Sequence, residues 1–202
     1  MLLSRSKIGI IIATVFMVSF PVLSQADVAK TAQQCDTCHG KNGVSTDGKV
    51  PTIAGFSAAS IIDILPQYQS GARHAEAYTP KGGKKSDMKA ATNGMSEKDF
   101  AAIAAHYAKQ KFVASKQSVD AALAKKGEKI HNKSCEKCHS EGGTLAEDDA
   151  SILAGQWKPY LARQFALIKA GKREIPKKMK KKLDKLSAAD IKAITEYYAG
   201  KK

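Results

Sequence analysis

The sequence predicts an all-α protein made of two tandem copies of one small domain. Residues of the first half recur in the second half at a shift of 100, so that Ala54 and Gly55 match Ala154 and Gly155. Each half also ends in a segment that begins Ser-x-x-Asp, a helix-start signature, and then places apolar or aromatic residues one helical turn apart. Neither half shows the strict apolar–polar alternation of a half-buried strand. A duplicated helical domain accounts for all of these observations.

The first helices of the two halves are expected in matching places. Residues 28–34 and 121–134 are rich in helix-forming residues and open the two copies. The segments around Ile61 and Leu161 then provide a middle helix in each half.

The shift between the halves changes in their last third. Ser96 matches Ser187 and Tyr107 matches Tyr198, which is a shift of only 91 residues, and the final helix of each half is predicted to begin at its serine. The first half therefore holds nine extra residues before its last helix. The turn-rich segment 79–86, Thr-Pro-Lys-Gly-Gly-Lys-Lys-Ser, is the natural place for them, and it is predicted to be a surface loop.

One five-residue pattern, Cys-x-x-Cys-His, occurs once in each half and uses all four cysteines of the chain. Two thiols at this spacing can add to the two vinyl groups of one heme, while the histidine that follows ligates the iron. The sequence therefore predicts two covalently bound c-type hemes. The predicted attachment and ligand residues are Cys35, Cys38 and His39 in the first half and Cys135, Cys138 and His139 in the second.

Three other uses of paired cysteines fit the chain less well. A structural zinc site needs two Cys-x-x-Cys pairs roughly 15–20 residues apart, far closer than these. A thioredoxin-like redox pair would follow a buried strand, and no Val/Ile-rich run precedes either motif. Two structural disulfides remain possible in an exported chain, but they leave the two histidines unexplained.

The N-terminal segment 1–26 resembles a cleavable export signal. Arg5 and Lys7 precede a short apolar run over 8–20, and a small-x-small site ends at residue 26. Because Pro21 follows this run and about 20 apolar residues are needed to cross a bilayer, an uncleaved membrane anchor is the weaker alternative. The mature chain is predicted to be periplasmic and to have no transmembrane anchor.

The repeat divides the mature chain into two domains. We expect an N-terminal domain over 27–110 and a C-terminal domain over 119–202. The linker over 111–118 is short, so the two domains should sit close together.

The second axial ligand of each iron is predicted to be a methionine. Met88 and Met179 both lie eight residues before the Ser-x-x-Asp signature of their half, whereas Met95 matches a leucine and is predicted to be a packing residue. Met179 stands in the lysine run 177–182 without apolar neighbours in the sequence, which favours iron ligation over packing. His74 is the remaining alternative to Met88.

The chain is strongly basic, with 33 Lys and Arg residues against 19 Asp and Glu residues. Nucleic acid is not an expected partner in the periplasm, so this charge favours an acidic redox partner protein or an anionic membrane surface. The lysines around Met179, together with Lys172, Arg173 and Lys185, are the predicted docking face. A basic face that simply interacts with solvent is the alternative.

Histidine and methionine together occupy both axial positions of an iron and leave no open site for oxygen or substrate. The sequence therefore predicts an electron-transfer protein and not an enzyme. A diheme peroxidase needs one iron with a missing or displaceable ligand, and both halves keep a matching methionine.

These features resemble those of class I cytochromes c, in which Cys-x-x-Cys-His is followed by Ile/Leu-Ala-Gly, a ligand methionine and an amphipathic last helix. The tandem arrangement resembles diheme members of this class, which implies two class I domains that each wrap one heme. Class I members usually place a proline after the heme motif, whose carbonyl accepts the ring proton of the ligand histidine. Pro51 suits that role, and its counterpart is Ser151.

Segments 116–123, 135–143, 152–161 and 177–179 are similar to the cytochrome subunit of flavocytochrome c sulfide dehydrogenase. This resemblance implies that the chain accepts electrons from an FAD-containing subunit that oxidises sulfide. The alternative is a freestanding diheme carrier between membrane redox complexes and a terminal oxidase, which the repeat supports equally well.

Overall fold

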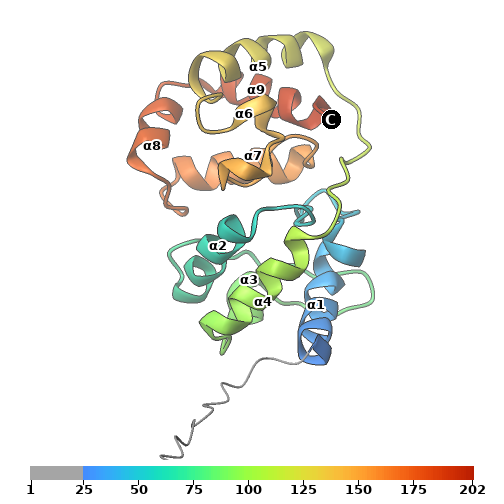
Figure 1. The fold of residues 1–202 in the computed structure, drawn as a ribbon. Coiled ribbons are helices and arrows are strands. Elements are labelled where there is room, and N and C mark those ends of the chain that lie inside the picture. The colour runs from blue at the N-terminus through green and yellow to red at the C-terminus, as the bar shows by residue number, and fades with distance from the viewer. Residues whose placement is uncertain (1–24) are drawn as a thin grey trace, which may run out of the picture.

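The computed structural model describes residues 25–202, so the export signal predicted over 1–26 falls almost wholly outside the described residues. Figure 1 shows two groups of helices joined by an extended segment. Within 25–202 the regular structure is helical, apart from two isolated β-bridges. None of the described helices is both long enough and apolar enough to cross a membrane.

The N-terminal group packs its last helix against the first two. Its core includes Phe56, Ile61, Ile103 and Tyr107. The last helix contacts both the first and the second helix of the group, which brings the first heme motif next to the buried Tyr107. The elements are α1 (Gln25–His39), η1 (Lys41–Gly43), α2 (Ala58–Ser70), α3 (Met88–Thr92) and α4 (Glu97–Ala108).

The C-terminal group repeats this plan. Its core includes Leu161, Phe165, Ile194 and Tyr198, and its first and last helices pack along each other. Gly127 allows this close approach, because a Cβ atom there would lie 2.2 Å from the Ala193 carbonyl oxygen. The elements are α5 (Ala121–Ser134), α6 (Ser140–Gly143), η2 (Ala146–Asp148), α7 (Lys158–Lys169), α8 (Lys177–Leu183) and α9 (Ala188–Gly200).

The predicted starts of the two last helices are confirmed. Ser96 caps α4 and Ser187 caps α9, and each forms a reciprocal capping box with the aspartate three residues later. In the second box the Asp190 carboxylate accepts from the Ser187 backbone N–H at 3.1 Å, and the Ser187 hydroxyl accepts from the Asp190 N–H at 3.1 Å. The local sequence therefore fixes both helix starts.

The extra residues of the first half form an exposed hairpin-like loop, as predicted. Tyr78 and Ser86 exchange backbone hydrogen bonds of 2.7 and 2.9 Å, and residues 81–86 between and beside them are exposed. The Tyr78 hydroxyl donates to Asp47 at 2.9 Å, which ties the loop to its own domain.

The extended linker is bound to the C-terminal group rather than free. The Ser115 backbone N–H donates to the Gly155 carbonyl at 2.8 Å, and the Gln117 side chain donates to the Gln156 carbonyl at 2.8 Å. The same Gln117 side chain accepts from the Lys158 N–H at 2.9 Å. These bonds hold the linker on the C-terminal group, and the domains themselves touch where Gln156 bonds Thr52.

Candidate heme sites

The first heme motif lies on a continuous helix. α1 extends through Cys35, Cys38 and His39, and this spacing places the three side chains on neighbouring positions of one helical face. His39 is only 7% exposed, and its Nδ1–H donates to the Pro51 carbonyl at 2.9 Å. Burial lowers the pKa of His39, although the Pro51 carbonyl acts in the opposite direction. The ring is thereby oriented with Nε2 left for a metal.

The second heme motif follows a helix end instead. α5 ends at Ser134, and Cys135 leaves the helical conformation at φ −120°. The motif then folds as a turn, in which the Cys138 and His139 backbone N–H groups both donate to the Cys135 carbonyl at 3.0 Å. Within residues 27–202 the His139 ring forms no hydrogen bond, so the Ser151 carbonyl does not take the part that the Pro51 carbonyl takes in the first half.

A buried tyrosine supports each motif from the last helix. The Tyr107 hydroxyl lies 3.0 Å from the Ala32 carbonyl oxygen and 2.8 Å from the Asp36 carboxylate, so α4 is tied to α1 beside Cys35. Burial raises the pKa of Tyr107 far above its usual value, so this hydroxyl stays protonated.

In the second half a histidine stands between the matching tyrosine and carboxylate. His131 is fully buried, its Nδ1 lies 2.9 Å from the Tyr198 hydroxyl, and its Nε2 contacts the Glu136 carboxylate. Sequence reasoning assigned no site to His131. Its place one helical turn before Cys135 is the signal that could have identified it, because the matching residue of the first half is Thr31, which has no ring nitrogens.

Cys35, Cys38, Cys135 and Cys138 form no disulfide in the structure, which leaves their sulfurs for the predicted attachment to heme. Before a heme is attached, burial raises the pKa of the Cys35, Cys38 and Cys135 thiols. Among residues 25–202 no three His, Cys, Asp or Glu side chains gather as a metal cluster, so the two motifs do not combine into a zinc site. The four thiols remain in two separate pairs.

The predicted methionine ligands occupy equivalent elements. Met88 is the first residue of α3 and Met179 lies in α8, and each of these short helices precedes the last helix of its group. Met95 packs against the N-terminal core. The sequence argument that Met179 lacks apolar neighbours is wrong, because Met179 packs against the C-terminal core, to which Leu183, one turn further along α8, belongs.

Two matching arginines meet at the boundary between the domains. Arg73 and Arg173 form an isolated antiparallel bridge, and both guanidinium groups donate to Gln164 Oε1, at 3.0 and 2.8 Å. Arg73 is 3% exposed, and its Nε has no hydrogen-bond partner. Burial and the Arg73 charge lower the pKa of Arg173 to about 10. Arg173 is half-buried, and its guanidinium group is engaged with Gln164, whereas the predicted docking lysines Lys172 and Lys185 are exposed.

The comparisons with known proteins identify the family. The family model described as "Cytochrome C oxidase, cbb3-type, subunit III" matches residues 122–197. Cytochrome c4 of Stutzerimonas stutzeri is 30% identical over 179 residues, which cover 82% of this chain and 83% of that protein. Cytochrome c4 of Pseudomonas aeruginosa is 29% identical over 84% of both chains. The chain belongs to the cytochrome c4 family.

The fold comparison agrees. The crystal structure of reduced recombinant cytochrome c4 from Pseudomonas stutzeri superposes with a TM-score of 0.70 at 27% identity, over 88% of this chain and 98% of that one. Cytochrome c4 structures contain two class I cytochrome c domains, so the predicted fold class and the two covalent c-type hemes are confirmed. Nothing in the comparisons is specific to flavocytochrome c sulfide dehydrogenase, so the resemblance is shown only at the level of the diheme family.

The described residues fit the heme groups of a cytochrome c4. Each heme brings two propionate carboxylates, and the Arg73–Arg173 pair has no carboxylate partner among residues 27–202. Buried charges are normally paired, and guanidinium groups bind carboxylates through two parallel hydrogen bonds. The free Arg73 Nε therefore suits a heme carboxylate. A heme bound at each motif would supply a single-electron iron couple.

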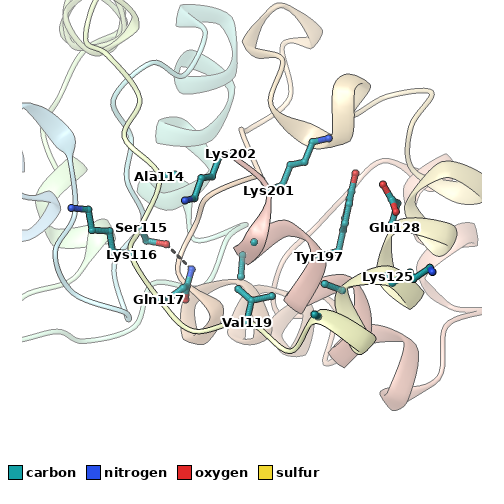
Figure 2. Close-up of a pocket in the computed structure, with 14 residues that line it drawn as sticks. Ala114, Ser115, Lys116, Gln117, Val119, Lys125, Glu128, Tyr197, Lys201 and Lys202 are labelled. Atoms are coloured by element: carbon teal, nitrogen blue, oxygen red, sulfur yellow. Dashed lines mark hydrogen bonds between the residues drawn. The ribbon is translucent and has the colours of Figure 1, made fainter.

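A large groove of the C-terminal domain lies apart from these sites. The groove has a volume of about 780 Å³ and lies between the linker, α5 and the end of α9. Figure 2 shows the side chains that line it. Its lining includes Val119, Tyr197 and several lysines, but none of the predicted attachment or axial residues. We assign it no part in heme binding.

Proposed function

We propose that this cytochrome c4 family member is a freestanding periplasmic diheme carrier that passes single electrons between membrane redox complexes and a terminal oxidase. The observation that carries the proposal is that each of two packed domains has its own heme motif and a methionine in a matching helix. Iron with histidine and methionine on its two faces has no open position for bond chemistry. Relatives that are cytochromes c4 over most of their length support a carrier role.

The domain boundaries and the location are part of this proposal. Residues 27–110 and 119–202 would form the mature domains, with 111–118 as linker, after removal of 1–26. The hydrogen bonds of Ser115 and Gln117 to the C-terminal group support a linker in this place. N-terminal sequencing of the protein purified from a periplasmic extract tests the cleavage, since an intact Met1 would contradict it.

The proposed axial residues are His39 and Met88 for the first iron and His139 and Met179 for the second. The matching positions of α3 and α8 support the two methionines. Met95 lies between α3 and α4, at the position that matches Leu186, which supports its exclusion. His74 is exposed, and its backbone N–H donates to the Lys172 carbonyl at 2.9 Å, at the domain boundary.

The test is to replace each methionine by alanine and record the methionine-to-iron absorption band of the oxidised protein. Met88→Ala and Met179→Ala should each remove about half of the band, because each removes one of two sulfur ligands. Met95→Leu is the matched control and should keep the band. A full band in the Met88→Ala protein would overturn the assignment of the first site.

The exposed lysines of α8 form the proposed docking face for an acidic redox partner. Lys177, Lys178 and Lys181 are exposed and have no ion pair within residues 27–202. The nearby Lys182 acts on the pKa of Cys135, so this face borders the second heme motif. Positive charge beside a heme edge orients an acidic partner and raises the association rate.

Replacing these three lysines by glutamine should lower the rate of electron transfer to an acidic acceptor about tenfold at low salt, and the difference should disappear at high salt. The matched control replaces Lys81, Lys84 and Lys85, three equally exposed lysines of the first-half loop. Equal loss in both variants would show an effect of net charge alone and would exclude a docking face on α8.

The more specific prediction from sequence, an FAD-containing sulfide dehydrogenase subunit as partner, remains a prediction. Gentle purification of the native protein distinguishes the two functions. A co-purifying flavoprotein would replace the freestanding carrier, whereas a flavin-free diheme protein would support it.

A further inference from the structure

A single peptide unit connects the first heme site to the C-terminal domain. The carbonyl of the peptide between Pro51 and Thr52 accepts from His39 Nδ1–H at 2.9 Å. The N–H of the same peptide donates to Gln156 Oε1 at 3.0 Å, and Gln156 Nε2 donates to the Thr52 carbonyl at 2.7 Å. Gln156 belongs to the C-terminal half, so this hydrogen-bond chain crosses the domain boundary.

This hydrogen-bond chain is buried, and both of its ends are held in place. Gln156 and Thr52 are each 1% exposed, and His39 is 7% exposed. The Gln156 backbone carbonyl is held in turn by the linker residue Gln117. Water does not compete for these groups, so each hydrogen bond polarises the next one along the chain.

The second half has no such chain. Phe56 stands at the position that matches Gln156 and is buried in the N-terminal core. The His139 ring forms no hydrogen bond within residues 27–202. The arrangement is therefore a difference between the two heme sites and not a general property of the repeat.

We infer that Gln156 is a positioning residue for the first heme, which acts on the ligand His39 from the neighbouring domain through the Pro51–Thr52 peptide. An amide whose N–H is bound to an acceptor has a more negative carbonyl oxygen. That oxygen accepts more strongly from His39 Nδ1–H and makes the imidazole a stronger donor to iron. Ferric iron in the first heme is stabilised, while the second heme is unaffected. The inference rests on the proposed ligation by His39.

The test is a potentiometric titration of the intact diheme protein with variants of opposite expected sign. Gln156→Leu removes the acceptor, so the one-electron reduction equilibrium of the first heme should shift about threefold to tenfold toward the ferrous state. Gln156→Glu keeps an acceptor, so the shift should be absent or reversed. In the ferrous Gln156→Leu protein, the NMR signal of His39 Nδ1–H should move upfield as its hydrogen bond weakens.

The matched control is Trp157→Phe. Trp157 Nε1–H donates to the Ser45 carbonyl at 3.1 Å across the same boundary, but it has no bond to the Pro51–Thr52 peptide. This variant should loosen the interface without changing either potential. Equal shifts in the leucine and phenylalanine variants, shifts of the same sign in the leucine and glutamate variants, or no shift would each overturn the inference.

The His39→Ala substitution should change the spectrum of the first heme. An unchanged spectrum would overturn the proposed ligation by His39 and not the inference about Gln156, so the two failures are distinguishable.

Discussion

Arg73→Gln should lower the reduction potentials of both hemes. The Arg73 guanidinium is 3% exposed, stands beside Arg173 and has no carboxylate partner within the described protein. Because the two arginines share the acceptor Gln164, they form one positive site at the boundary and not two separate ones. Removing one positive charge therefore lowers the electrostatic repulsion of ferric iron in the hemes of both domains.

The expected size follows from Coulomb's law. A unit charge about 10 Å from an iron, at an effective dielectric constant of about 20, contributes about 1.7 kcal/mol. This energy corresponds to a factor of roughly 15 in the one-electron equilibrium, or about 70 mV. Burial is the main cause that lowers the pKa of His139, and the Arg173 charge contributes in the same direction, so Arg173 lies within electrostatic range of the proposed second ligand histidine.

Spectroelectrochemical titration of the intact protein measures both potentials. Arg163→Gln is the control, because Arg163 carries the same charge on α7 but is 44% exposed and paired with Glu76 across the boundary. Solvent screening should leave both potentials nearly unchanged in this control. If Arg73→Gln shifts neither potential, or shifts only one, the two arginines do not form a shared site.

Three further outcomes follow from the packing around the motifs. Asp190→Asn should lower the free energy of unfolding at neutral pH. Lys126 and then Ser187 lower the Asp190 pKa to about 2, so the stabilisation by this carboxylate is present above about pH 4 and is lost as the pH falls through 2. Urea unfolding of both proteins across this pH range measures the difference. Tyr107→Phe should lower the free energy of unfolding by about 1–3 kcal/mol, because the hydroxyl bond to a carboxylate is lost, and equal midpoints in guanidinium would contradict this. His131→Leu should cost a similar amount, about 1–3 kcal/mol, because two buried hydrogen bonds disappear, and an unchanged thermal midpoint would exclude the bridging role.

The helices could be predicted from the sequence because their signals are local. The caps at Ser96 and Ser187 need only a partner three residues away, and the structure contains both. The two heme motifs were equally predictable from the sequence, since five consecutive residues specify the chemistry. Even there, the sequence did not predict that the first motif would be helical and the second a turn after Ser134.

The contacts at the interface between the two domains could not be predicted in this way. Gln156 binds Thr52, which lies 104 residues earlier, and Arg73 meets Arg173 across 100 residues. Neither pairing follows from a period or a spacing, because both depend on how two finished domains dock. The substitution of Gln156 for the matching Phe56 was visible in the repeat, but its partner was not.

The lysine run around Met179 shows where reasoning from neighbours in the sequence fails. A linear segment of charges around Met179 suggested a residue without apolar neighbours, yet α8 turns Met179 and Leu183 toward the core while its lysines face outward. On a helix, side chains three or four residues apart lie on the same face, whereas residues next to each other in the sequence lie on different faces. The placement of Met179 in a matching helix is therefore the better argument for its role.

The repeat makes the two heme sites similar, but the contacts around them give their potentials an order. His39 donates to the Pro51 carbonyl, whose peptide is held by Gln156, so with His39 as the proposed ligand the first iron would have the more electron-rich imidazole and a more stable ferric state. His139 lacks this partner within residues 27–202, and the positive Lys182 lies within electrostatic range of Cys135, so ferrous iron would be favoured in the second site. Both effects make the reduction potential of the first heme lower than that of the second. Electrons should therefore move from the first heme to the second, beside the proposed docking face, and a higher potential at the first heme would refute this order.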